Sequence, residues 1–138
     1  PPGALRLGPA RPGETLWAVG RPKVGASVRL DDPEIADLRA LRLLLASPHL
    51  HLCVPAGSGG VAAEGRQLAL EAGLTWEPEE AREGAGPAFP LSASAGPATC
   101  LVAVGSEELG AWWSREAEAA ARRSGRPLPP ITRVGRLR

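Results

Sequence analysis

The chain has 138 residues, of which 43% are hydrophobic, and its formal net charge is +1 at pH 7. A chain of this length is expected to form one domain with an ordinary core, and its charge gives no general argument for nucleic acid as a partner. No apolar run approaches the roughly 20 residues of a membrane-spanning helix, and residues 1–13 lack the apolar stretch of a signal peptide.

The two cysteines, Cys53 and Cys100, both fall in predicted strands. We therefore expect buried thiols rather than a disulfide, as in a reducing compartment. This predicts a cytoplasmic protein without a membrane partner. The chain has no methionine, not even an initiating one, which suggests a processed or excised segment.

The N-terminal part is predicted to form a tail, a strand and a helix. Residues 1–13, rich in Pro, Gly and Arg, are interpreted as a linker or tail, and residues 14–138 as one domain. A strand is expected over Thr15–Val19. Asp31 or Asp32 is expected to cap a helix that ends at Ser47-Pro48. Its apolar stripe comprises Ile35, Leu38, Leu41, Leu44 and Leu45.

The central stretch predicts a strand, a glycine turn and a second helix. Leu50, Leu52 and Val54 alternate with His49, His51 and Cys53, which is typical of a strand over Leu50–Val54. Glycines then form a turn, and Val61–Ala72 has helical spacing closed by Gly73. A short third strand is expected over Leu74–Glu77.

The C-terminal part predicts two strands separated by a helix, after a long loop. Residues 79–96 are expected to form a partly packed surface loop. Apolar strands are expected over Thr99–Val104 and Ile131–Leu137, and between them a helix capped by Ser106 that ends near Gly125. Adjacent residues on a helix are about 100° apart, so one of Trp112 and Trp113 should be in the core. The other should lie at an edge or on a partner.

The predicted order is β-α-β-α-β, a long loop, then β-α-β. This order indicates an α+β domain, which we expect to have a mixed sheet with helices packed on one face.

The glycine turn is the strongest candidate for a binding site. It comprises Gly57, Ser58, Gly59 and Gly60, and it precedes a helix N-terminus, where free N–H groups and the helix dipole favour an anion. A plain tight turn explains the same pattern. The segment 21–29 carries Arg21 and Lys23, which could clamp a phosphate or carboxylate or simply lie in a solvated turn.

Other chemistries have weaker support. His49, His51 and Cys53 on one strand face could ligate a metal, and the distant Cys100 could supply a fourth ligand, but no fourth ligand lies nearby in the sequence and we predict no metal site. No orienting Asn or Asp accompanies a cysteine nucleophile, so no catalytic residue is predicted. The C-terminal third is rich in arginine, but glutamates share its helix and no aromatic stacking platform is evident, so nucleic-acid binding is not expected.

The order of these segments resembles the C-terminal domain of the AIR synthase-related superfamily. Members have a Pro-Gly-Asp turn before a strand that ends in glycine, and here the chain reads Pro12-Gly13-Glu14 and then LWAVG. A family motif like D-x-S-D-G-G corresponds to Pro55-Ala56-Gly57-Ser58-Gly59-Gly60. The closing ITRVGRL resembles a family strand that contains Ile-Gly-Arg or Val-Gly-Arg. The resemblance covers nearly all of residues 12–137.

The resemblance implies one half of a two-domain, commonly dimeric, ATP-dependent small-molecule enzyme. In such enzymes the other domain carries the metal ligands and most of the site for ATP and Mg²⁺. The C-terminal domain would contact a phosphate-containing ligand through Gly57, Ser58, Gly59 and Gly60. A second edge of the cleft would come from Lys23, Gly25 and Ser27.

The chain departs from the family where the motif has aspartates, because Pro55 and Ser58 stand there. The chain is therefore expected to bind a ligand without catalysing a reaction on its own, next to a partner domain or a second copy. The alternative is a non-catalytic interaction or dimerisation module that uses an exposed sheet or Trp112 and Trp113.

Overall fold

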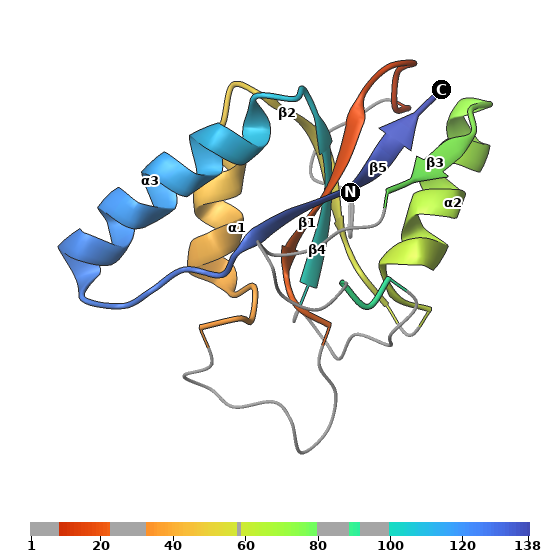
Figure 1. Ribbon diagram of the computed structural model, residues 1–138. Coiled ribbons are helices and arrows are strands. Elements are labelled where there is room, and N and C mark those ends of the chain that lie inside the picture. Colours follow the sequence, from red (N-terminus) through yellow and green to blue (C-terminus); the bar gives the residue numbers. More distant parts are fainter. Residues whose placement is uncertain (1–8, 23–32, 58, 80–88, 92–99) are drawn as a thin grey trace.

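The computed structural model describes residues 9–22, 33–57, 59–79, 89–91 and 100–138. These residues form five strands and three helices in the order predicted from the sequence (Figure 1). Their bounds are β1 (Thr15–Gly20), α1 (Leu38–Leu45), β2 (Leu50–Pro55), α2 (Gly60–Ala72), β3 (Trp76–Pro78), β4 (Cys100–Gly105), α3 (Leu109–Ser124) and β5 (Ile131–Leu137). None of the described helices combines the length and hydropathy needed to cross a membrane.

The five strands form one sheet in the order β2-β4-β1-β5-β3. Every neighbouring pair is antiparallel, so the predicted mixed sheet is wrong. The reason is that strands joined by a helix do not lie next to each other in the sheet. The strands that a helix joins are separated in the sheet by one strand, as in split β-α-β units, or by three in the case of β2 and β3, so strands of the same direction never become neighbours.

The helices cover both faces of the sheet, and the prediction of helices on one face is therefore wrong (Figure 1). Side chains of β1 alternate between two cores, because successive strand residues point to opposite faces. Leu16 and Ala18 lie in the core beneath α2, whereas Trp17 and Val19 lie in the core beneath α1 and α3. The α+β class itself is confirmed.

The first helix begins later than predicted. Asp37 is its N-cap and accepts a 2.9 Å hydrogen bond from the amide of Ala40. Glu34 is held outside the helix, because its carbonyl accepts a 2.8 Å hydrogen bond from the amide of Arg21. Leu44 is fully buried, as expected for a member of the predicted stripe, whereas Leu38, also predicted to be in the stripe, is the first residue of the helix and is 61% exposed.

A β-bulge in β2 breaks the simple alternation predicted from its sequence. Leu50 pairs with Gly105 and Leu52 with Val104, which leaves His51 as the extra residue. Leu50 and Cys53 consequently share the core beneath α1 and α3, and Leu52 faces α2. The prediction that His49, His51 and Cys53 share one regular face is wrong for this reason.

The ends of the longer helices agree with the sequence only in part. Gly73 and Gly125 close α2 and α3 in the left-handed conformation, as predicted. Ser106 is not the cap of α3, because the helix begins at Leu109 and Ser106 belongs to the turn before it. Trp113 is the core member of the tryptophan pair and donates a 2.9 Å hydrogen bond from Nε1 to the carbonyl of Pro129.

Both cysteines are free, buried thiols, as predicted. Burial raises the pKa of Cys100 to about 12. A thiol in this state is a poor nucleophile, because the thiolate is the reactive form.

Candidate functional site at the loop end of the sheet

The segments that carry the predicted site residues leave the same end of the sheet, which we call the loop end. Here β1 and β2 end on either side of the start of β4. Gly20 pairs with Cys100, and Pro55 pairs with Leu101. The amide of Ala56 donates a 2.9 Å hydrogen bond to the carbonyl of Cys100, so the chain stays bonded to β4 up to the glycine turn. The turn then leads to Gly60, the first residue of α2. The loop end is the lower end of the sheet in Figure 1.

Some of the predicted residues lie outside the part that the structure describes. These are Lys23, Gly25 and Ser27 from the first segment and Ser58 from the glycine turn. Gly57, Gly59 and Gly60 are described and lead into α2. Gly60 has a φ of 74°, a conformation that side-chain-bearing residues rarely adopt, so this position in the turn requires glycine.

Two backbone donors at the start of α2 have internal partners. The amide of Gly60 donates a 3.0 Å hydrogen bond to the carbonyl of Gly57, and the amide of Ala62 donates a 2.8 Å hydrogen bond to the carbonyl of Leu91. The N-cap residue, Gly59, has no side chain to act as an acceptor. The predicted array of donors is therefore reduced by the bonds that form the turn and its contact with residue 91.

A carboxylate that the sequence analysis missed lies beside this turn. A Cβ placed on Gly57 would lie 3.7 Å from Oε1 of Glu64. Burial, and to a smaller extent the charge of Glu71, raises the pKa of Glu64. Helical side chains point toward the N-terminus of their helix, so a residue four positions after Gly60 was a reasonable candidate for this place. Its negative charge would oppose an anion at the turn.

The arginine of the predicted cationic clamp has a structural partner. Nε of Arg21 lies 2.9 Å from Oε2 of Glu34, and the backbones of the two residues are also hydrogen-bonded. This geometry fastens the chain after β1 to the turn before α1. Arg21 therefore has a structural role, and Lys23 stays a prediction.

At the opposite end of the sheet, the side chains of His51 and Glu14 lie within hydrogen-bond distance of each other. Nδ1 of His51 lies 2.8 Å from Oε1 of Glu14, and the two side chains are only 14% and 15% exposed. The same carboxylate oxygen accepts a 2.6 Å hydrogen bond from the amide of Arg11. The contact between His51 and Glu14 therefore connects β2 to the turn before β1. Among the described residues, no group of three or more His, Cys, Asp or Glu side chains could hold a metal ion.

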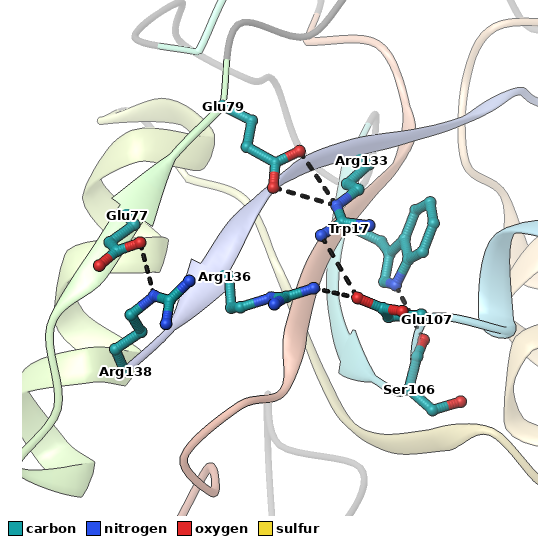
Figure 2. Close-up of polar contacts among 8 residues, drawn as sticks. All are labelled: Trp17, Glu77, Glu79, Ser106, Glu107, Arg133, Arg136 and Arg138. Carbon is teal, nitrogen blue, oxygen red and sulfur yellow. Dashed lines mark hydrogen bonds and ion pairs between the residues drawn. The ribbon is translucent and has the colours of Figure 1, made fainter.

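Two arginines of β5, and Arg138 directly after it, form a belt of ion pairs with glutamates from neighbouring segments (Figure 2). The β5 ion-pair belt comprises Arg133 with Glu79 and Glu107, Arg136 with Glu107, and Arg138 with Glu77. Trp17 lies beside it and donates a 3.3 Å hydrogen bond from Nε1 to the carbonyl of Ser106. Because each of these arginines has a carboxylate partner, the belt offers little excess positive charge to an anionic ligand.

Comparison with known proteins gives one match, and it concerns the fold. No family model matches the sequence, and a search of curated proteins gives no significant match. Among solved structures, E. coli HypE matches with a TM-score of 0.56 and 18% sequence identity, over 92% of this chain and 44% of the HypE chain. The chain has the fold of part of HypE.

HypE is an AIR synthase-related protein, so the match agrees with the sequence resemblance at the level of an α+β fold shared with part of HypE. The chain spans less than half the length of the HypE chain. At this level of identity the comparison concerns the fold, and it assigns no ligand to the loop end.

Proposed function

We propose that this chain is the ligand-binding half of an AIR synthase-related, ATP-dependent small-molecule enzyme, and that it is not catalytic on its own. Its loop end contacts a phosphate-containing ligand. The glycine turn of Gly57, Ser58, Gly59 and Gly60 forms one edge of the binding site, and Lys23, Gly25 and Ser27 belong to the other. ATP and Mg²⁺ are bound mostly by a partner domain.

The observation that carries this proposal is the fold shared with HypE over 92% of the chain. The arrangement of strands supports it further. Because Gly20 and Pro55 lie on either side of the first residues of β4, the strands that lead into the two predicted segments end two strand spacings apart. Strands in a sheet are about 4.8 Å apart, so both segments can reach one small ligand.

A titration of the ¹⁵N-labelled chain with inorganic phosphate, and separately with ATP and Mg²⁺, tests the proposal. We expect the amide signals of Gly57, Gly59 and Val61 to shift with a common dissociation constant in the millimolar range or below. The amides of Gly125 and Arg126, in the turn after α3, serve as the internal reference. Absence of a selective shift at the glycine turn would reject the proposed binding edge.

The alternative, an interaction or dimerisation module that uses an exposed sheet or the tryptophan pair, has less support from the geometry. Helices pack against both faces of the sheet. Trp113 is 1% exposed and is committed to the core beneath α1 and α3. Trp112 is half-buried against the same core. A concentration series in sedimentation velocity tests the alternative, because a dimerisation module must self-associate without ligand and a chain that stays monomeric would reject it.

A further inference from the structure

The distal part of α3 projects beyond the sheet. Trp113 is the last buried residue of this helix, and Ser114–Ser124 contains no buried residue. Figure 1 shows this part of α3 pointing away from the sheet, with the turn that follows it at the far left. Because most helical stability in proteins comes from packing of an apolar face, a helical arm of this kind needs other support.

Arg39 of α1 provides that support at the end of the arm. Its Nη1 donates a 2.9 Å hydrogen bond to Oγ of Ser124 and a 3.1 Å hydrogen bond to the carbonyl of Arg126. Its Nη2 donates a 2.6 Å hydrogen bond to the carbonyl of Pro127. Gly125 closes the helix between these acceptors in the left-handed conformation. The turn 124–127 is therefore fixed to α1, although all of its residues are exposed.

Three guanidinium groups around this turn lack a carboxylate partner in the part of the chain that the structure describes. All three acceptors of Arg39 are neutral, so its charge is not compensated. Arg123 and Arg126 are exposed, and neither forms an ion pair with a described residue. Arg122, by contrast, pairs with Glu118. We call Arg39, Arg123 and Arg126 the arginine tip.

The helix dipole explains only part of this arrangement. Arginines in the last turn of a helix stabilise its C-terminus, which accounts for Arg122 and Arg123. Arg126 lies beyond the helix, and Arg39 comes from another helix. The arginines of the β5 ion-pair belt have glutamate partners. The arginine tip therefore presents positive charge that the described part of the fold does not neutralise.

We propose that the arginine tip is an interaction surface for an acidic segment of a partner protein. Guanidinium groups match carboxylates in shape and charge, and bind them through paired hydrogen bonds. A nucleic acid fits the chain less well, because the net charge is only +1 and the turn 124–127 has no aromatic side chain on which a base could stack. The tip lies on the α1 and α3 side of the sheet, whereas the glycine turn leads into α2 on the other side. This inference is therefore independent of the function proposed above.

The number of arginines decides which anions bind here. One exposed ion pair adds little to affinity, so inorganic phosphate, which pairs with one arginine at a time, binds the tip weakly. The amides of Gly125 and Arg126 therefore remain a valid reference in the phosphate titration. A segment with several carboxylates engages several arginines together, and each further pair forms at a high effective concentration.

Hexaglutamate serves as the probe, and its binding to the ¹⁵N-labelled chain is followed by NMR at low salt. We expect selective shifts of the amides of Arg123, Gly125 and Arg126. Replacing two tip arginines, in Arg123→Ala/Arg126→Ala, should raise the dissociation constant by about fivefold or more. The matched control is Arg66→Ala/Arg115→Ala, which removes the same charge from exposed positions of α2 and α3. The control should change the dissociation constant by less than about twofold.

The outcomes separate a specific surface from a general effect of charge. Equal weakening in the two double variants would show attraction to the net charge and reject the proposal. Shifts confined to other parts of the chain in the wild type would reject it as well, and this readout decides the matter if a variant fails to fold. A DNA duplex that binds the tip more tightly than hexaglutamate at the same salt concentration would overturn the assignment to an acidic protein segment.

Discussion

Gly110, the second residue of α3, lies directly against the indole of Trp17 in β1. A Cβ at position 110 would lie 2.5 Å from Cη2 of Trp17 and 2.6 Å from Cζ3, which is closer than real carbon atoms approach. The absence of a side chain at Gly110 thus allows the first turn of α3 to rest on the sheet. It also places Ser106 where its carbonyl accepts the indole N–H.

Gly110→Ala should destabilise the fold by about 2 kcal/mol, because the added methyl must displace either the helix or the indole. Urea unfolding followed by the fluorescence of Trp17 and the other tryptophans measures the loss. Ala111→Ser, on the exposed side of the same turn, is the control and should change stability by less than about 1 kcal/mol. Equal effects of the two substitutions would contradict the close packing of Trp17 on α3.

Within the glycine turn, Gly60 and Gly57 should respond differently to the same substitution. Gly60→Ala forces a side chain into a φ of 74° and should cost about 1–2 kcal/mol of folding stability. Gly57→Ala meets only Oε1 of Glu64, at 3.7 Å, and should cost less than about 0.5 kcal/mol. Thermal unfolding of both variants checks the contrast, and a larger loss in Gly57→Ala would show that the turn has another shape.

The raised pKa of Glu64 makes the folding stability decrease as pH rises. Because burial, and then Glu71, raise this pKa above its ordinary value of 4.5, the folded chain holds the proton more tightly than the unfolded chain does. The carboxyl group therefore lowers stability as pH rises from 4.5 through the raised value. Glu64→Gln should be more stable than wild type near neutral pH, and the difference should vanish at about pH 3. An advantage that is the same at both pH values would contradict this reasoning.

Glu64 should also weaken phosphate binding at the glycine turn. Two like charges about 6 Å apart near a protein surface repel by roughly 1–3 kcal/mol before salt screening. Glu64→Gln should therefore tighten phosphate binding by about threefold or more at low salt, and the gain should shrink in high salt. Phosphate titrations at two ionic strengths measure this. Unchanged affinity at low salt would place the phosphate away from Glu64.

The two buried thiols allow a simple test of the sheet core. Burial raises the pKa of Cys100 to about 12, so little thiolate is present at ordinary pH. Neither Cys53 nor Cys100 should react with a thiol-specific reagent in the native chain, and both should react in denaturant. If the reagent releases a coloured thiolate on reaction, its absorbance gives the number of cysteines that have reacted. Rapid reaction of either thiol in the native state would contradict its burial.

Local patterns in the sequence were enough to predict the strands, the order of elements and the glycine C-caps. Apolar alternation and left-handed glycines act over a few residues, and Gly73 and Gly125 end their helices as expected. The sequence did not predict the bulge at His51, which depends on how β2 meets Gly105 of β4. It also did not predict the late start of α1, because Arg21 holds Glu34 in a turn through a contact between segments.

The candidate site shows the same division between local and tertiary information. The glycine turn is visible in the sequence, and the structure confirms that it leads into α2. The Leu91 carbonyl on Ala62 and the carboxylate of Glu64 near Gly57 arise from packing across the loop end. A pattern of residue types carries no signal for a backbone acceptor that arrives from about 30 positions further along the chain.

Paramagnetic mapping with Mn²⁺ and ATP tests most directly whether the loop end holds the ligand. ATP serves here as a phosphate-containing probe. The unpaired electrons of Mn²⁺ broaden nearby amide signals, so the measurement locates the phosphates of the probe on the chain. We predict selective broadening at Gly20, Ala56 and Gly59, with sharp signals at Glu14, His51 and Leu109 at the opposite end of the sheet. Broadening confined to the opposite end, or spread evenly over the chain, would contradict a ligand site at the loop end.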